Sequence, residues 1–248
     1  MGILQKIVAN TKANLAHKKV ELPLEKIQSS LENLKLPRGK FKDHISSKDE
    51  AIIAEIKKAS PSAGVIKEDF DPTKIAMEYE SFGASALSIL TEEDFFMGSV
   101  EYLKEVKKIT SLPILRKDFM IDEYQIYESK LIGADCILLI ASILTDQEID
   151  NFINIAKKLE LDYLIEVHDE NELKRVEHFE DALIGVNNRN LETFEVDLNN
   201  SVRLRNTFKQ KNIFIAESGI KSREDMNYLK MNNIKVFLIG ESLMRGSF

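Results

Sequence analysis

The sequence predicts an α/β protein, a single (β/α)8 TIM barrel with an N-terminal helical extension. Short runs rich in Ile, Val and Leu alternate with segments of helical period, and eight such runs use nearly the whole chain of 248 residues. Strands that are apolar on both faces and alternate with helices are typical of parallel sheets with right-handed crossovers. Eight such units close most simply into a barrel, so residues 1–248 are expected to form one domain.

The first part of the chain, residues 1–45, precedes the first apolar run and has a helical pattern. Ile3, Leu4, Ile7 and Val8 fall on one helical face, and further apolar residues repeat at helical spacing up to Leu31. We expect this segment to cap the barrel that residues 46–248 form.

The predicted strands are bounded by helix signals. Asp71-Pro72 is typical of a helix start, Thr145 and Ser222 each begin a capping-box pattern, and Gly83 and Gly133 are suited to left-handed helix ends. An open doubly wound sheet is the alternative, but no glycine-rich first turn is present to hold a dinucleotide. The strands are expected at 52–57, 85–90, 113–119, 135–140, 162–167, 182–187, 212–217 and 235–240.

Composition narrows the class of protein. Hydrophobic residues make up 44% and charged residues 30%, as in globular domains, and no apolar run is long enough to span a membrane. With no signal-peptide stretch, a cytoplasmic protein is expected. The net charge of −7 argues against a nucleic-acid partner. The one cysteine, Cys136, lies in an apolar run and is interpreted as a small buried hydrophobe.

Charged residues mark the ends of the predicted strands, where barrels of this kind bind ligands. Glu55 and Lys57 are two residues apart in an apolar run, so both side chains point to the same side of the strand. A structural ion pair would explain them equally well, but polar residues recur at the later strand ends. These are Lys117, Glu166, Asn187 with Arg189 two residues further on, Glu217 with Ser218, and Gly240.

The third predicted strand leaves one question open. Leu115, Lys117 and Phe119 alternate with Arg116 and Asp118, and only one of these sets can face the barrel interior. If the first set faces inward, Lys117 enters the site and Phe119 offers an apolar wall for an aromatic ligand.

The loops after the last two strands predict a phosphorylated ligand, and the long loop after the first strand predicts a lid. The loops after the last two strands contain Gly219 and Gly240, and in such barrels these loops frequently bind phosphate through backbone N–H groups. The loop at 58–69 is long for a strand-to-helix connection and carries Ser60 and Ser62, so we expect it to act as a lid that contacts the ligand.

The chain resembles the indole-3-glycerol-phosphate synthase family of tryptophan biosynthesis over nearly its full length. The resemblance rests on six motifs in order: Ala54-Glu-Ile-Lys-Lys-Ala-Ser-Pro-Ser62, Leu115-Arg-Lys-Asp-Phe119, Ile165-Glu-Val-His168, Gly185-Val-Asn-Asn-Arg189, Ala216-Glu-Ser-Gly-Ile220 and Gly240-Glu-Ser-Leu-Met244. It implies a lyase that converts 1-(2-carboxyphenylamino)-1-deoxyribulose 5-phosphate to indole-3-glycerol phosphate, carbon dioxide and water. It also implies a monomer that needs no metal and no organic cofactor.

The resemblance assigns roles to the strand-end residues. Lys117 is expected to be the general acid for ring closure, Lys57 the partner of the substrate carboxylate and Glu166 the base. Glu55 is expected either to orient Lys57 or to share the proton transfers. The division of proton transfers between the two lysines stays open. Substrate positioning is expected from Phe119, Asn187, Arg189, Glu217 and Ser218, and phosphate binding from Ser60, Gly219, Gly240 and the backbone N–H of Glu241.

Two further expectations accompany the resemblance. His168 follows Glu166 at i+2 and is interpreted as a strand-end histidine satisfied by hydrogen bonds of a loop. Phe248 comes soon after Gly240, whereas relatives continue into a closing helix, so a shortened or absent last helix is expected. The alternatives are another phosphate-binding barrel, such as the isomerase of the same pathway or the tryptophan synthase α subunit, and a non-catalytic binding barrel.

Overall fold

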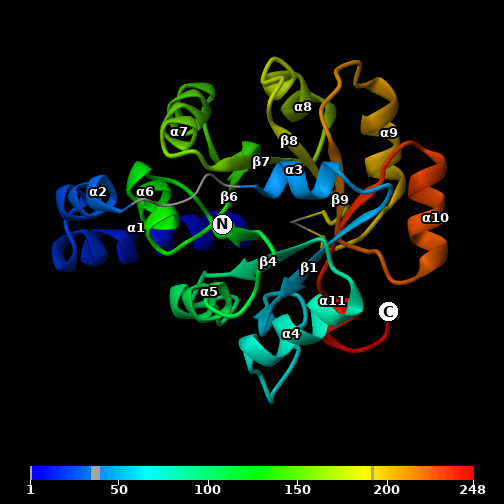
Figure 1. Ribbon diagram of the computed structural model, residues 1–248. Coiled ribbons are helices and arrows are strands. Elements are labelled where there is room, and N and C mark those ends of the chain that lie inside the picture. The colour runs from blue at the N-terminus through cyan, green and yellow to red at the C-terminus, as the bar shows by residue number, and fades with distance from the viewer. Residues whose placement is uncertain (1, 35–39, 191–192) are drawn as a thin grey trace.

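The barrel is closed, as a computed structural model shows for residues 2–34, 40–190 and 193–248. Eight parallel strands follow one another around it in the order β1-β10-β9-β8-β7-β6-β5-β4, and β4 pairs again with β1 (Figure 1). The expected (β/α)8 fold is therefore confirmed. The barrel strands are β1 Ala51–Ile56, β4 Ala86–Leu90, β5 Ile114–Lys117, β6 Cys136–Ile140, β7 Asp162–Val167, β8 Leu183–Asn187, β9 Phe214–Glu217 and β10 Val236–Ile239.

The observed strands match the predicted ones to within two residues at most ends. The main difference lies after β1, where the expected irregular loop contains a small antiparallel hairpin of β2 Ala59–Ser60 and β3 Gly64–Val65. Gly64 adopts a φ of 64°, a conformation that suits glycine, and this turn brings the two short strands together. The segment after β1 is thus an ordered hairpin that extends over the strand ends.

The helices form an outer ring around the barrel (Figure 1). Their starts follow the sequence signals: Thr145 and Ser222 make reciprocal capping boxes, and the side chain of Asp71, just before Pro72, accepts the backbone N–H groups of Thr73 and Lys74. In chain order they are α1 Ile3–Glu21, α2 Leu24–Asn33, α3 Phe41–Ser46, α4 Pro72–Phe82, α5 Val100–Lys107, α6 Glu123–Leu131, the 3₁₀ turn η1 Ala141–Ile143, α7 Asp146–Lys158, α8 Glu170–Val176, α9 Asn199–Thr207, α10 Arg223–Met231 and α11 Glu241–Met244.

The N-terminal extension forms helices, as expected, over most of its described residues. These helices pack against different parts of the barrel. Helix α3 places Phe41 and Ile45, both fully buried, against the barrel interior next to Ala51 at the start of β1. It therefore closes the barrel at the end opposite the predicted site. Helices α1 and α2 lie beside α6, where Lys19 pairs with Asp122 at 2.7 Å. Residues 35–39, between α2 and α3, lie outside the described part of the chain.

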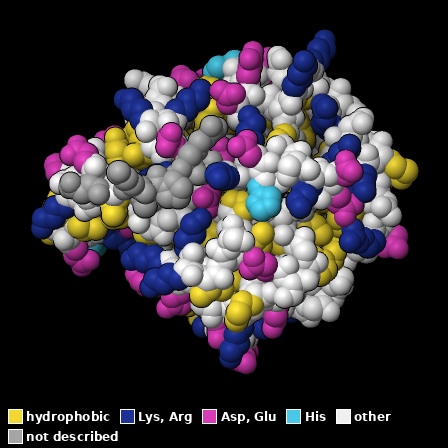
Figure 2. Space-filling model, viewed as in Figure 1, with side chains coloured by type: hydrophobic (Ala, Val, Ile, Leu, Met, Phe, Trp, Pro, Cys, Tyr) yellow, Lys and Arg dark blue, Asp and Glu magenta, His cyan; other side chains and the backbone are white. Residues whose placement is uncertain are grey.

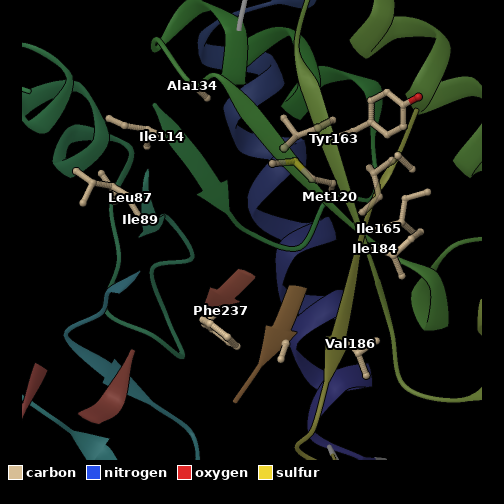
Figure 3. Close-up of a cluster of buried hydrophobic side chains, with 14 of the residues drawn as sticks. Leu87, Ile89, Ile114, Met120, Ala134, Tyr163, Ile165, Ile184, Val186 and Phe237 are labelled. Carbon is tan, nitrogen blue, oxygen red and sulfur yellow. The ribbon is translucent and has the colours of Figure 1, made fainter. Parts of the chain in front are cut away.

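The apolar core has two main layers, which follow from the alternation of side chains along each strand. One set fills the barrel interior and includes Leu115, Cys136 and Leu164, all fully buried. The other set lies between the strands and the surrounding helices, and Figure 3 shows part of it, with Ile165, Ile184 and other labelled side chains projecting from the strands. Burial of both strand faces explains why the strands read as continuous apolar runs.

The surface and the chain end complete the description. Basic and acidic side chains are interspersed over the face seen in Figure 2, with only scattered apolar groups among them. Within the described residues, no helix is long and apolar enough to cross a membrane. Helix α11 is a single turn, in agreement with the shortened last helix that was expected.

Candidate active site

The predicted site residues converge on one cavity at the carboxyl ends of the strands. The cavity has a volume of about 480 Å³, which suits a ligand of drug-like size. Every site residue predicted from the sequence lines it. These residues are Glu55, Lys57, Ser60, Lys117, Phe119, Glu166, Asn187, Arg189, Glu217, Ser218, Gly219, Gly240 and Glu241.

The register of β5 places Lys117 in the cavity. Arg116 points the other way, toward the helices, and is 1% exposed. Its guanidinium pairs with Asp118 at 3.0 Å and with Glu128 at 2.7 Å, so the buried cation is neutralised there. The set of Leu115, Lys117 and Phe119 therefore faces inward.

Lys117 is held between two carboxylates. Its Nζ lies 3.0 Å from Glu166 Oε2 on β7 and 2.5 Å from Glu217 Oε2 on β9. Burial on its own would lower the pKa of Lys117, but the negative charges of Glu166, Glu217 and Glu55 outweigh it and raise that pKa above its ordinary value. The side chain is therefore an ammonium group.

The two carboxylates that share Lys117 differ in their protonation. For Glu166, burial alone would raise the pKa, but Lys117 and His168 lower it. For Glu217, burial and the negative charge of Glu166 prevail over Lys117, so its pKa is raised. One ammonium group cannot fully neutralise two buried carboxylates, so Glu217 takes up a proton more readily than Glu166 does.

Glu55 and Lys57 form an ion pair with each other at the end of β1. Both are largely buried, with side chains 4% and 17% exposed. Gly240, at the end of β10, lies against them, because a β-carbon at this position would overlap Glu55 Oε1. The close approach explains why a glycine is needed at the end of β10.

The end of β8 links the carboxylates to the far side of the cavity. Asn187 donates a hydrogen bond from Nδ2 to Glu166 Oε1 at 3.2 Å, and its Oδ1 accepts the backbone N–H of Arg189 at 3.0 Å. The Arg189 guanidinium in turn lies 3.9 Å from Glu241 Oε2. The Arg189 backbone is therefore held by Asn187, while its guanidinium group forms part of the cavity wall.

The turn after β9 has an unusual backbone. Ser218 and Gly219 both have positive φ angles, 66° and 82°. A serine in this conformation carries strain of about 1 kcal/mol or more, and such strain is concentrated at functional sites. A β-carbon on Gly219 would also overlap the Val196 side chain. The two residues bend the chain sharply so that its backbone borders the cavity.

The apolar wall comes from three parts of the chain. The rings of Phe119, after β5, and Phe96, after β4, lie 5.9 Å apart. Ile3 and Leu4 from the first turn of α1 also line the cavity. An aromatic ligand could pack against these side chains while its polar groups meet the strand ends.

The hairpin after β1 contributes hydroxyl groups at the cavity edge. The Ser60 Oγ accepts the backbone N–H of Ala63 at 3.2 Å and lies 3.4 Å from the Ser62 Oγ. Both serines line the cavity, as predicted for this segment. The hairpin is also tied to the loop after β4, because the Ala59 N–H donates to the Phe96 carbonyl.

Several lining residues were not predicted from the sequence. Phe96, Lys221 and Arg245 line the cavity together with Ile3 and Leu4. The position of Phe96 soon after the second predicted strand was a usable signal. Arg245 had no such signal, since it follows the last predicted strand by several residues; at the cavity it pairs with Glu241 at 3.0 Å.

His168 is held differently from the prediction. Its backbone N–H and Nδ1 both meet Glu172 Oε2 of helix α8, at 2.8 and 3.3 Å, so a helix rather than a loop provides the partner. Its Nε2 is buried and makes no hydrogen bond. Among the described residues, no cluster of His, Cys, Asp and Glu is arranged to hold a metal ion.

Comparisons with known proteins agree on one family. Residues 4–247 match the family model described as indole-3-glycerol phosphate synthase. The chain is 45% identical to the indole-3-glycerol phosphate synthase of Lachnoclostridium phytofermentans, covering 99% of this chain and 95% of the relative. It is 47% identical to that of Ruminiclostridium cellulolyticum, with 98% and 94% covered.

A solved structure supports the fold alone. The N-acetylmannosamine-6-phosphate 2-epimerase from Clostridium perfringens superposes with a TM-score of 0.60 at 14% identity, covering 82% of this chain and 92% of that one. At this identity the likeness extends to the barrel architecture and not to the chemistry.

Proposed function

The chain belongs to the indole-3-glycerol phosphate synthase family, and from this premise we propose how its cavity residues divide the work of the reaction. The enzyme is a carboxy-lyase of tryptophan biosynthesis that acts on 1-(2-carboxyphenylamino)-1-deoxyribulose 5-phosphate. One observation carries the proposal: the Lys117 Nζ lies within hydrogen-bonding distance of both Glu166 and Glu217, in the cavity that Lys57 also lines.

The reaction needs acid and base groups at separate points. In ring closure, the aromatic carbon that bears the carboxylate attacks the ribulose carbonyl, whose oxygen takes a proton. The carboxylate then leaves as carbon dioxide. In the dehydration, the new hydroxyl group takes up a second proton and leaves as water, and a base removes a hydrogen from the newly closed ring. The site must therefore supply two protons and accept one.

We assign the first proton transfer to Lys117. As an ammonium group it can donate to the carbonyl oxygen and stabilise the alkoxide that develops there. Its carboxylate partners raise its pKa, which makes it a weak acid. Substrate hydroxyl groups that bind Glu217 would draw this carboxylate away from Lys117, so that the ammonium group becomes more acidic and turns toward the carbonyl oxygen.

Lys57 is assigned to the substrate carboxylate. Its ammonium group pairs with Glu55, and this pair lines the same cavity as Lys117. A cation beside the carboxylate holds the aromatic ring for attack, and Glu55 orients that cation. Lys57 is then also positioned to protonate the departing hydroxyl.

Glu166 is assigned the role of base in the dehydration. Its pKa is lowered despite burial, chiefly by Lys117, so it is ionised when the substrate arrives. Asn187 holds one of its oxygens through a hydrogen bond of 3.2 Å, and this contact orients the carboxylate. A positioned carboxylate at this point can accept the ring hydrogen.

The remaining residues are assigned to substrate positioning. We place the substrate's aromatic ring against Phe119 and its phosphate beside the turns that carry Gly219 and Gly240. The Glu241 side chain would repel phosphate, and its pairing with Arg245 keeps the carboxylate occupied. The positioning groups are Arg189, Glu217 and Ser218, and the phosphate groups are Ser60, Gly219, Gly240 and the backbone N–H of Glu241.

The state of the protein is a further part of the proposal. We propose that residues 1–248 form one domain and that the enzyme works as a cytoplasmic monomer, without nucleic acid or membrane partners. The closed barrel and the convergence of the assigned residues on one cavity support the single domain. Size-exclusion chromatography with light scattering measures the mass in solution, and a mass twice that of the chain would refute the monomer.

A direct assay tests the activity. Purified protein is incubated with 1-(2-carboxyphenylamino)-1-deoxyribulose 5-phosphate, and indole fluorescence is followed; the chain contains no tryptophan that would obscure it. Appearance of indole-3-glycerol phosphate is the expected result. Binding of the substrate without product would indicate a barrel that only binds, and absence of binding would contradict the assigned substrate.

A further inference from the structure

His168 lies beside the carboxylate that was assigned as the base. It follows Glu166 by two residues at the end of β7, so the two side chains point to the same side of the strand. The His168 Nε2 is buried, makes no hydrogen bond and lies 3.5 Å from Glu166 Oε1. A buried polar atom without a partner is uncommon and indicates a function or a contact that forms in another state.

Glu172 of helix α8 fixes the other side of the ring. Its Oε2 accepts the His168 backbone N–H at 2.8 Å and lies 3.3 Å from Nδ1. The contact requires a proton on Nδ1, since a carboxylate can only accept a hydrogen bond. With Nδ1 protonated, the ring can offer a second N–H at Nε2 only as an imidazolium.

We propose that His168 is a positioning residue for Glu166: held by Glu172, its imidazolium donates from Nε2 to Glu166 Oε1 during turnover and keeps that carboxylate ionised and in place. The inference rests on the proposed role of Glu166 as the base. It adds a residue that does not line the cavity and acts only through Glu166.

The need for such a group follows from what Lys117 has to do. Lys117 neutralises Glu166 through Oε2, at 3.0 Å. When Lys117 turns to the substrate carbonyl, Glu166 loses this cation while it stays buried. An unpaired buried carboxylate tends to take up a proton, and a protonated Glu166 cannot act as the base. His168 can replace the lost cation from the opposite side.

The surroundings of the ring favour its charged form. Three carboxylates face it: Glu166 on its own strand, Glu172 on α8 and Glu217 on β9. Burial would lower the pKa of His168, but the hydrogen bond to Glu172 and these charges raise it. From helix α9, the Asn200 amide donates to the His168 carbonyl at 3.0 Å, and the Arg203 guanidinium in turn donates to the Asn200 Oδ1 at 2.6 Å. On the other side of Glu166, Lys117 is the nearest cation.

The first test measures the coupling without any turnover. Each of the four histidines is followed by NMR against pH in the full-length protein and assigned by single substitutions. We expect Glu166→Gln and Glu172→Gln each to lower the pKa of His168 by about one unit or more. Glu170→Gln removes an exposed charge from the same helix and is the control, with an expected change within about 0.2 units. A His168 pKa that is unchanged by Glu166→Gln overturns the proposal.

The second test asks whether the coupling matters for the reaction. His168→Gln keeps an N–H donor but removes the charge. We expect its kcat to fall about tenfold with KM changed less than about twofold, because an ionised Glu166 is needed for the chemical step and not for substrate binding. The decline of wild-type kcat as His168 loses its proton should be absent from the variant. His178→Gln is the control and should leave the profile as in the wild type.

The outcomes separate this inference from the proposed function. If Glu166→Gln retains turnover, Glu166 is not the base and the underlying assignment fails, whatever His168 does. If Glu166→Gln abolishes turnover but His168→Gln has the wild-type pH profile and kcat, only the inference about His168 is wrong. A purely structural role would lower stability in His168→Gln without altering the pH profile.

Discussion

The Glu217 carboxylate fits against β8 only because residue 185 is a glycine. A β-carbon on Gly185 would overlap Glu217 Oε1 and come within 3.1 Å of the Leu164 side chain. The two residues lie on neighbouring strands, two positions apart in register. Gly185 pairs with Ile215, and Asn187 pairs with Glu217. Gly185 therefore sets the position of the carboxylate that holds Lys117 from the side of β9.

A methyl group at this position should reduce activity through Glu217. We expect Gly185→Ala to displace the carboxylate and lower kcat/KM by about tenfold to a hundredfold, because small misplacements in an active site are costly. Steady-state kinetics with the double variant checks the route. Gly185→Ala added to Glu217→Gln should cost little more, whereas additive losses would mean that Gly185 acts elsewhere.

Lys117 should be required for chemistry more than for binding. We expect Lys117→Met to lower kcat by a factor of about 100 to 10,000, because the carbonyl oxygen loses its acid. The substitution leaves the proposed contacts with the phosphate and the aromatic ring of the substrate in place, so the dissociation constant should change far less. Calorimetry and single-turnover kinetics measure the two quantities separately, and near-wild-type turnover would show that Lys117 is not the acid.

Stability should depend on pH through Glu217. Burial and the nearby Glu166 raise its pKa, so the folded chain holds this proton more tightly than the unfolded chain. Its contribution is therefore complete below the ordinary value of 4.5 and is lost as pH rises toward neutrality. The pKa of Glu166 is shifted in the opposite direction, so Glu166 changes the stability of the fold only at lower pH.

Glu217→Gln tests this relation. The variant should flatten the dependence of unfolding free energy on pH between about 4.5 and 7, with a difference on the order of 1 kcal/mol across the window. Lys117 keeps Glu166 as its partner in this variant. Urea unfolding at several pH values measures the slope. Glu101→Gln, at an exposed site, should leave the slope unchanged, and a Glu217→Gln slope equal to that of the wild type would contradict the assignment.

Arg116 should matter for stability and not for catalysis. Its guanidinium is fully buried and pairs with Asp118 and Glu128, and Arg116→Met would leave both carboxylates without a cation. We expect a loss of about 3–5 kcal/mol in the free energy of unfolding. Lys104→Met removes an exposed pair and should cost less than about 1 kcal/mol. Urea unfolding compares the two, and equal losses would refute the difference in burial as the cause.

Much of the fold could be predicted because each strand carries its own signal. The alternation of apolar runs with capped helical segments depends on neighbours within the chain, and it located all the barrel strands. Local chemistry also predicted the capping boxes at Thr145 and Ser222. The hairpin of β2 and β3 was not predicted, because two-residue strands such as Ala59–Ser60 have no periodicity to detect.

The sequence by itself determined which residue types stand at the strand ends, because parallel strands in a barrel present those ends at one mouth. Glu55 and Lys57 belong together by their spacing alone. Only the tertiary structure decided that Lys117 rather than Arg116 faces the cavity, because both alternating sets are compatible with a strand and the choice depends on what each meets across the barrel wall. The same holds for His168. Its partners Glu166 and Glu172 lie close in the chain, yet only the packing of α8 after β7 shows that Glu172 meets Nδ1 while Nε2 faces Glu166.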